Sequence, residues 1–211
     1  MPGTDKLVEG YRRFKEGYCK DHQELLNNLA EVGQSPKIAL VSCCDSRVEP
    51  TIIMDCDPGD LFVIRNVANL VPPCEVSDHH HGTSAALEFA VTGLEVESII
   101  ILGHTKCGGI KALMDADENQ KEKTFIANWM KQLSPIKQEI INNDKFVSPE
   151  HRYHACEKRG IMQSISNLMT FPWVKARVEA GSLQLHGWYY DLNSAELYAF
   201  NPDIGDFAKI S

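Results

Sequence analysis

Two short clusters carry the side chains best suited to chemistry in this 211-residue sequence. The first reads Cys-Cys-Asp-Ser-Arg over residues 43–47, and the second reads Gly-His-Thr-Lys-Cys over residues 103–107. Zinc binds thiolate and imidazole together readily, at roughly 2.0–2.3 Å. His104 and Cys107 are three residues apart in a turn flanked by glycines, so both can point at one ion. The second cluster therefore predicts a zinc site.

The first cluster should supply only one of its two cysteines, because adjacent side chains on a strand point to opposite faces. Spacing alone leaves Cys43 and Cys44 both open. Either one, with His104 and Cys107, gives three protein ligands. Structural zinc normally has four protein ligands, whereas catalytic zinc keeps one position for water. The count favours a catalytic site. A closed structural site needs Cys44, Asp45 or another residue as its fourth ligand.

The elements that must position both clusters are short apolar runs at residues 37–43, 61–64 and 98–103. Nearly continuous apolar runs are typical of strands that are buried on both faces of a parallel sheet. A helical pattern at 83–92 connects the second run to the third and gives a βαβ unit. Because ligands bind beyond the carboxyl ends of such strands, we expect the two clusters to converge there.

We therefore predict an α/β fold, with a mostly parallel central sheet flanked by helices and an N-terminal helical arm. The length fits a single domain over residues 1–211, divided into an arm (1–33) and a zinc-binding core (34–211). Helical spacing of apolar residues predicts two arm helices joined near residues 18–20. Further helices are expected around 109–114, 125–142 and 149–169. Strand-like runs at 183–190 and 196–200 are expected to form a hairpin or a sheet edge.

Composition excludes several classes of partner. The formal net charge is -8 and no Lys/Arg cluster dominates, so a nucleic-acid partner is not expected. No apolar stretch approaches the length of a membrane span. The start lacks the pattern of a secretory signal, and the seven cysteines are an odd number, typical of reduced thiols. We expect a cytoplasmic protein with a small substrate, although removal of an organelle-targeting segment stays open.

The two clusters together resemble the β-class carbonic anhydrases, which carry Cys-x-Asp-Ser-Arg and His-x-x-Cys as here at Cys43 and His104. The flanking segments 62–69, 103–109 and 185–188 are similar as well. The resemblance implies reversible hydration of carbon dioxide to bicarbonate and a proton, by attack of zinc-bound hydroxide. It also implies that Cys43, rather than Cys44, is the ligand, with one Zn²⁺ per subunit. Family members form dimers or dimers of dimers, with the active site at the dimer interface.

Asp45 and Arg47 are the catalytic residues that the resemblance implies. Asp45 should accept a hydrogen bond from the zinc-bound water, and Arg47 should hold Asp45 in a charge-assisted pair. That pair would also keep the carboxylate from becoming a fourth zinc ligand. Two thiolates cancel the formal charge of the ion and weaken it as a Lewis acid. We therefore expect activity to rise toward about pH 8–9.

The resemblance extends to residues that would line the substrate pocket. Gln34, Phe62 and Val67 match the plant-like form of the subtype in which water occupies the fourth zinc position. Phe89 stands where plant-like members carry Tyr, so a hydroxyl is missing there.

A second subtype binds inhibitory bicarbonate in a pocket of Trp, Arg and Val. Here the Trp position is Leu40, while Arg65 and Val48 remain. Three successive histidines, 79–81, depart from the family pattern. They are interpreted as a polar turn, with a second metal site or proton shuttling as the alternatives.

Two rival functions stay open at this level. A relative on the same fold could hydrolyse another small linear molecule, such as carbon disulfide. A non-catalytic structural zinc protein, with Asp45 as the fourth ligand, is the rival from another class.

Overall fold

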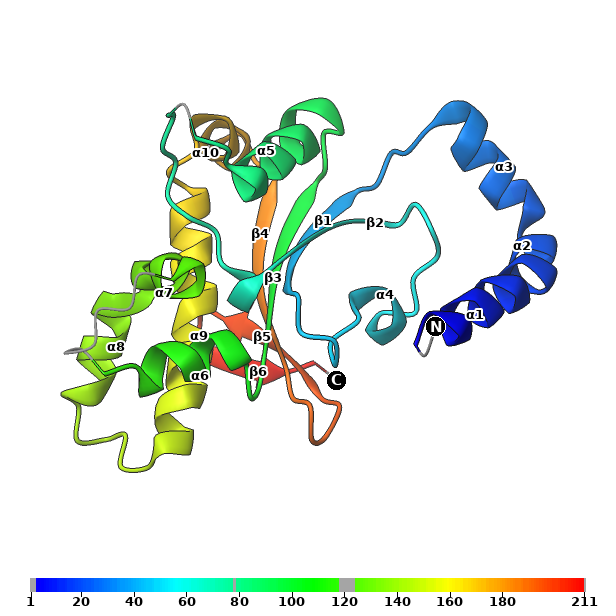
Figure 1. Ribbon diagram of the computed structural model, residues 1–211. Coiled ribbons are helices and arrows are strands. Elements are labelled where there is room, and N and C mark those ends of the chain that lie inside the picture. The colour runs from blue at the N-terminus through cyan, green and yellow to red at the C-terminus, as the bar shows by residue number, and fades with distance from the viewer. Residues whose placement is uncertain (1–2, 78, 118–123, 211) are drawn as a thin grey trace.

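The computed structural model describes residues 3–77, 79–117 and 124–210 (Figure 1). The strands form one sheet in the order β2-β1-β3-β4-β5-β6. Their bounds are β1 (Ile38–Cys43), β2 (Leu61–Asn66), β3 (Ser98–His104), β4 (Gln184–Tyr190), β5 (Leu197–Asn201) and β6 (Asp206–Lys209). The first four strands are parallel, whereas β5 and β6 pair antiparallel. The predicted α/β class and mostly parallel sheet are confirmed.

The helices alternate with the parallel strands and then cluster in the second half of the chain. They are α1 (Thr4–Glu16), α2 (Tyr18–Asp21), α3 (Gln23–Val32), α4 (Pro50–Ile53), α5 (Gly82–Glu88), α6 (Gly108–Asp115), α7 (Phe125–Met130), α8 (Ser134–Ile141), α9 (Pro149–Leu168) and α10 (Pro172–Glu179). Short turns of other helix types are η1 (Val67–Asn69), η2 (Phe89–Gly93) and η3 (Lys131–Leu133). Over the described residues, no helix is both long and apolar enough to cross a bilayer.

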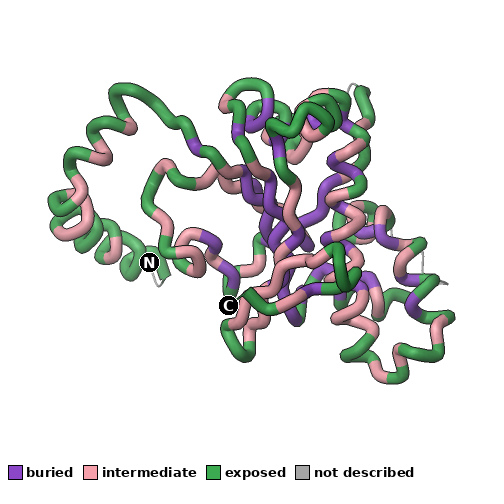
Figure 2. The backbone as a smooth tube through the Cα atoms, turned by 180° about the vertical axis from the view of Figure 1, so that it is seen from behind, coloured by how far each residue is buried: buried purple, intermediate pink, exposed green. Residues whose placement is uncertain are grey.

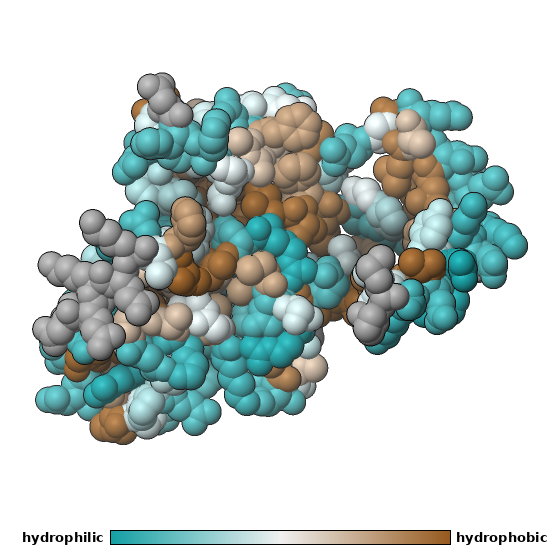
Figure 3. Space-filling model, viewed as in Figure 1, coloured by the Kyte–Doolittle hydropathy of each residue, from teal (hydrophilic) through white to brown (hydrophobic). Residues whose placement is uncertain are grey.

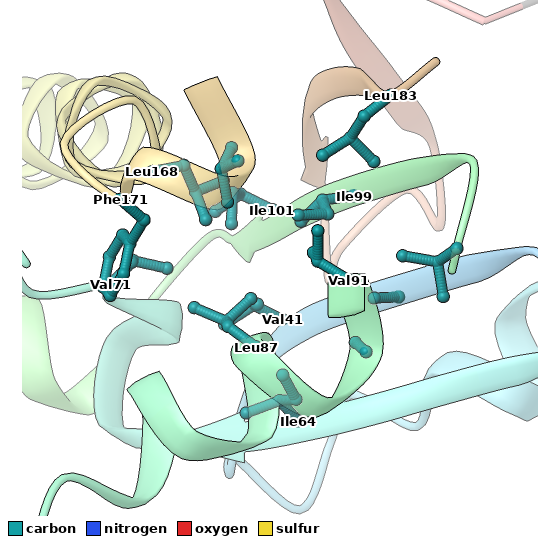
Figure 4. Packing of buried hydrophobic residues seen from close by; sticks show 14 of the residues in the cluster. Val41, Ile64, Val71, Leu87, Val91, Ile99, Ile101, Leu168, Phe171 and Leu183 are labelled. Atoms are coloured by element: carbon teal, nitrogen blue, oxygen red, sulfur yellow. The ribbon is translucent and has the colours of Figure 1, made fainter. Parts of the chain in front are cut away.

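One face of the sheet packs tightly against α5, α9 and α10. Alternate residues of the central strands, such as Val41 and Ile101, point into this core (Figure 4). The helix α9 comes close because Gly103 and Gly187 have no side chain. A Cβ atom at either glycine would lie 2.7 or 2.9 Å from a side-chain carbon of Ile161, which is closer than real contacts. These glycines therefore fix the distance between α9 and the two strands.

The opposite face of the sheet is only partly covered. Leu40, Ile100 and Leu102 are buried there beneath the short helix α4. Around them lies a rim of partly exposed apolar side chains: Ile38, Ile53, Met54, Leu61, Val63, Trp188, Tyr190, Leu192 and Leu197. Parallel sheets are normally covered on both faces. This chain by itself thus leaves apolar sheet surface open to solvent.

The arm α1–α3 extends away from the core, and none of its helices contains a buried residue (Figure 2). It contacts the core through a hydrogen bond of 2.6 Å from the Tyr18 hydroxyl to Asp57. The Leu29 side chain also packs against Gly59. The join near residues 18–20 is itself a helical turn, and the breaks fall at Gly17 and His22 instead.

Several elements differ from their predicted bounds. The single helix expected at 125–142 is divided into α7, η3 and α8. Pro135, in the first turn of α8, explains the break because proline has no N–H to donate to the preceding turn. The short helix α4, the helix α10 and the strand β6 were not predicted. The two tail strands do form the expected antiparallel hairpin.

Candidate metal centre

Cys43, His104 and Cys107 meet at the carboxyl edge of the sheet. Cys43 ends β1 and His104 ends the neighbouring parallel strand β3, so both side chains start from the same edge. Cys107 follows after a two-residue turn and precedes α6. Their possible ligand atoms all lie within 4.8 Å of one another, and all three residues are buried. The sheet thus brings Cys43 together with two residues that follow it by 61 and 64 positions in the sequence.

The geometry of these donors fits a zinc ion. The two sulfur atoms lie 3.9 Å apart, too far for a disulfide and close to the roughly 3.8 Å expected when two Zn–S bonds meet at a tetrahedral angle. His104 donates from Nδ1 to the carbonyl of Thr105 at 2.8 Å. Its Nε2 atom is buried with no hydrogen-bond partner. A buried, unpaired nitrogen is costly unless it binds something, and a metal ion is the partner that suits it.

The two cysteines are electrostatically coupled. A hydrogen bond from Cys107, assisted by His104, lowers the pKa of Cys43 to about 4 against the penalty of burial. The same interaction and burial raise the pKa of Cys107 above the ordinary range of thiols. Burial opposes protonation of His104, but the neighbouring Cys43 raises its pKa overall. The pair therefore gives up one proton easily and holds the second until a cation replaces it.

Asp45 is held beside this group by Arg47. The guanidinium donates from Nε to Oδ1 at 2.9 Å and from Nη2 to Oδ2 at 2.7 Å, and the backbone N–H of Arg47 adds a bond of 3.0 Å to Oδ1. These bonds hold the pKa of Asp45 well below its usual range. Oδ2 lies 4.0 Å from Nε2 of His104, longer than the roughly 3.4 Å expected between two ligands of one zinc. Asp45 also lies outside the group of mutually close donors.

Cys44 is exposed and lies outside the same group. Its backbone N–H donates to the carbonyl of Asn66 at 2.8 Å and thereby continues the pairing of β1 with β2. Burial and the neighbouring Cys43 raise the pKa of its thiol.

Arg65 organises the loop between Cys43 and Glu49, a role that sequence reasoning did not assign. Its guanidinium donates to the backbone carbonyls of Cys43, Asp45 and Val48 at 2.5–3.1 Å. It also forms an ion pair of 2.7 Å with Glu49. Leu40 is fully buried at the position that resembles the Trp of the bicarbonate-inhibited subtype.

Of the four expected pocket residues, only Val67 adjoins the metal-binding group within this chain. Val67 packs against the apolar cluster that contains Cys43 and Cys107. Its carbonyl accepts a hydrogen bond of 2.8 Å from the Trp129 indole. A Cβ at Gly109 would lie 2.7 Å from the Val67 side chain, so that glycine allows the contact.

Gln34, Phe62 and Phe89 lie toward the opposite edge of the sheet. Phe62 pairs with Ala39, four residues before Cys43 on β1, a distance of about 13 Å along the strand. The Phe89 ring is 5.9 Å from the Phe62 ring, and Gln34 is exposed ahead of β1. These three residues therefore do not reach the metal-binding group of their own chain.

The successive histidines lie beside a cavity of about 370 Å³ near Val67. His80 and His81 line it together with residues that include Asn66, Thr83 and Trp129. His81 also bonds to the Ser77 hydroxyl at 2.8 Å. Within the described part of the chain, the cluster with metal-ligand geometry is the Cys-His-Cys group, and these histidines form no such cluster.

Glu157 on α9 is a second residue that sequence reasoning missed. It is 4% exposed, and its carboxylate accepts the backbone N–H of Cys107 at 3.0 Å. The sequence analysis predicted a helix around 149–169 but assigned no role to Glu157. The signal that was available is the spacing of Glu157 with Ile161, Ser164 and Leu168, which recurs at one face of a helix.

Comparison with known proteins identifies this arrangement. A family model described as carbonic anhydrase matches residues 38–197. The chain is 40% identical to β-carbonic anhydrase 5, chloroplastic, of Arabidopsis thaliana, over 89% of this chain and 61% of that protein. The chain belongs to the β-class carbonic anhydrases. It is also 34% identical to a carbonic anhydrase of Synechocystis sp., over 96% of this chain and 73% of that one.

A solved β-carbonic anhydrase, CcaA, superimposes with a TM-score of 0.91 at 33% identity. The match covers 99% of this chain and 92% of that one. The resemblance inferred from the two clusters is confirmed, and with it the assignment of carbonic anhydrase activity.

Proposed function

We propose that this carbonic anhydrase hydrates carbon dioxide at one zinc ion per subunit, held by Cys43, His104 and Cys107. The observation that carries the proposal is the buried, unpartnered Nε2 of His104 beside two sulfur atoms at tetrahedral spacing. When bound, zinc acts as a Lewis acid that lowers the pKa of a coordinated water and makes it a nucleophile near neutral pH. The chain contributes three ligands and leaves the fourth position open.

Asp45 orients the attacking water. Its Oδ2 accepts a bond from Arg47 and lies on the side of His104 Nε2, so it has a lone pair left for a water proton. Because Arg47 keeps the carboxylate charged, Asp45 acts as an acceptor throughout the pH range of interest. After losing one proton, the oxygen of that water would form a bond to the carbon of carbon dioxide while one C=O π bond opens. The products are bicarbonate and a proton that passes to solvent.

The same contacts argue against the rival structural site. A fourth protein ligand would have to be Asp45 or Cys44, and both lie outside the group of mutually close donors. Asp45 would also have to give up its bonds from Arg47. The open fourth position therefore favours catalysis over a structural role. The carbon disulfide reading has no separate observation in its favour.

We infer that a second copy of the chain completes the substrate pocket. Gln34, Phe62 and Phe89 cannot reach their own metal-binding group, yet all three are at least partly exposed. The outer edge of β2 has no strand partner in the described chain, and apolar surface gathers between α5 and β2 (Figure 3). A second copy against that edge would bring its aromatic rings toward Val67 of the first. Each pocket would then combine residues of two chains.

The uncovered sheet face and the arm support the same assembly. The rim of partly exposed apolar residues on that face and the unburied stripe of Leu7, Tyr11 and Phe14 on α1 both lack cover in one chain. We propose a homodimer, or a dimer of dimers, of single-domain subunits whose arms (1–33) pack on a neighbour. The binding of nucleic acid is not proposed for this acidic chain.

We also propose a subtype and a cellular compartment for the protein. Arg65 is fully engaged by three carbonyls and Glu49, which supports the water-bound, plant-like subtype over bicarbonate inhibition. All seven cysteines are free, which supports a reducing compartment such as the cytoplasm. An organelle is the alternative compartment, because one relative is named chloroplastic.

Stopped-flow hydration of carbon dioxide, combined with zinc analysis, tests the proposed function. The zinc-loaded protein should accelerate hydration, and Cys107→Ser should lose both zinc and activity. A protein that binds one zinc per chain but leaves the rate at background would instead support the structural reading.

A further inference from the structure

A carboxylate is buried directly behind the metal ligands. The Glu157 side chain is 2% exposed. Its Oε1 accepts the Cys107 N–H at 3.0 Å, and its Oε2 accepts the Tyr189 hydroxyl at 2.6 Å. Among the described residues, no Lys or Arg pairs with it, and the nearest basic atom is Nδ1 of His154 at 3.5 Å. Burial of an acid without a cation is costly, so a purely packing role does not explain this residue.

The N–H that Glu157 accepts belongs to the peptide group between Lys106 and Cys107. The C=O of that same peptide group accepts a bond of 2.9 Å from Arg47 Nη2. One peptide group is thus held at its two ends, because Arg47 donates to its C=O and Glu157 accepts its N–H. Arg47 is also the residue that fixes Asp45. The peptide therefore links the Cys107 ligand to the Asp45–Arg47 pair.

The backbone at this point needs such support. Lys106 has a φ angle of 59°, in the left-handed region that residues other than glycine rarely adopt. This turn aims the Cys107 sulfur at Cys43, 3.9 Å away. If the peptide group rotated, the sulfur would turn away from the metal position. The side chain of Arg47 is about half exposed (51%), so water can replace its bond, whereas nothing can replace that of the buried Glu157.

We propose that Glu157 is a positioning residue that clamps the 106–107 peptide and so holds Cys107 in its metal-binding orientation. The proposal deepens the proposed function, since it concerns retention of the same zinc ion. Tyr189, on β4, fixes the carboxylate in turn and is backed by His154 at 2.8 Å. The clamp acts through the length and acceptor atom of the side chain, and not through its charge.

Variants of Glu157 distinguish a clamp that depends on the length and acceptor atom of the side chain from one that depends on its charge. In Glu157→Gln, the amide oxygen can accept the Cys107 N–H while the amide nitrogen donates to Tyr189, whose hydroxyl then donates to His154. Glu157→Asp keeps the charge but is one methylene too short to reach. Glu157→Met keeps the volume and removes the acceptor. We expect zinc to leave Glu157→Met and Glu157→Asp at least about tenfold faster than wild type, and Glu157→Gln within about threefold.

The readout is the rate of zinc transfer from the holoprotein to excess colorimetric chelator at pH 8. Ser164→Ala is the matched control, because Ser164 is on the same helix and accepts the buried N–H of Val71 at 3.1 Å, away from the metal. It should lower the melting temperature without accelerating zinc release. If Glu157→Met fails to fold, the contrast between Glu157→Asp and Glu157→Gln still decides.

Three results would overturn the clamp. They are zinc release at the wild-type rate in Glu157→Asp and Glu157→Met, equal acceleration by Ser164→Ala, or retention in Glu157→Asp with loss in Glu157→Gln. The last would assign the effect to charge. A wild-type protein that binds zinc but does not hydrate carbon dioxide would refute the proposed function and leave the clamp standing. A wild type that binds no zinc would refute both.

Discussion

The side chains around the metal position divide into those that hold the ion and those that hold the water. Cys43, His104 and Cys107 are mutually close, whereas Asp45 is kept apart by its bonds to Arg47. Residue type and spacing predicted His104, Cys107 and one of two adjacent cysteines as ligands, whereas the choice of Cys43 and the roles of the Asp-Arg pair came from the family resemblance. Glu157 was not predicted, because its helical spacing with Ile161 and Leu168 indicates a shared face but not that its carboxylate accepts the N–H of a metal ligand.

Replacement of Arg47 tests directly whether Asp45 acts on the water and does not bind the ion. In Arg47→Ala, Asp45 loses its two bonds from the guanidinium and becomes free to approach the metal, so we expect carbon dioxide hydration to fall by about 10–100-fold. Zinc content should stay at one ion per chain, because the three ligands remain. Arg159→Ala, which removes an exposed Arg paired with Glu139, serves as the control. Retained activity, or loss of zinc, would count against the assigned role.

The coupled cysteines predict how zinc affinity depends on pH. At neutral pH, Cys43, with its pKa of about 4, is already a thiolate, whereas the raised pKa of Cys107 keeps it protonated. Zinc must therefore displace at least one proton, and its affinity should rise by about tenfold or more per pH unit. Chelator competition at pH 6.5 and 7.5 measures this slope. An affinity that does not change with pH would contradict the proton assignment.

The secondary-structure elements place the site through the order and spacing of a few strands. The strands β1, β2 and β3 were predictable because uninterrupted apolar runs admit few other structures, but only β1 and β3 are buried, since β2 lies at the edge of the sheet. The break at Pro135 and the short helix α4 were not predicted. The sequence also did not predict that only one face of the sheet is well covered. The apolar pattern of a helix does not show on which face of the sheet that helix packs.

The close approach of α9 to the sheet is testable at Gly187. An added methyl group would lie 2.9 Å from Ile161 and 3.1 Å from Ile165, both packed in the core. Gly187→Ala should therefore lower the free energy of unfolding by about 1–3 kcal/mol. Gly82→Ala, where an added Cβ meets nothing within 4 Å, is the matched control. Denaturant unfolding measures both, and equal stabilities would refute the packing argument.

At the scale of the whole molecule, the described chain leaves apolar surface uncovered, as the proposed dimer would require. One sheet face, the β2 edge and the arm all lack cover, and three expected pocket residues face away from the chain's own metal-binding group. The sequence could not predict that these pocket residues lie far from the metal-binding group of their own chain. The same residues could equally have lined a pocket within one chain. The distance along β1 between Phe62 and Cys43 is the observation that supports the proposed second subunit.

Hybrid dimers test that proposal. Gln34→Ala and Arg47→Ala should each lower activity in homodimers. When the two chains are coexpressed and the heterodimer is purified with two tags, one pocket should carry both defects and the other none. The heterodimer should then recover up to about half of the wild-type activity per dimer, because one of its two pockets is intact. If each pocket used its own Gln34, both pockets would remain defective and no recovery would be seen.

The pH profile of carbon dioxide hydration by the zinc-loaded protein tests the central claim most directly. Two thiolates leave the ion with little net charge, so its coordinated water should ionise at a more alkaline pH than at a site with neutral ligands. We predict a rate well above background that rises between about pH 6 and 9. A rate at background with one zinc per chain, or a flat profile over this range, would contradict it.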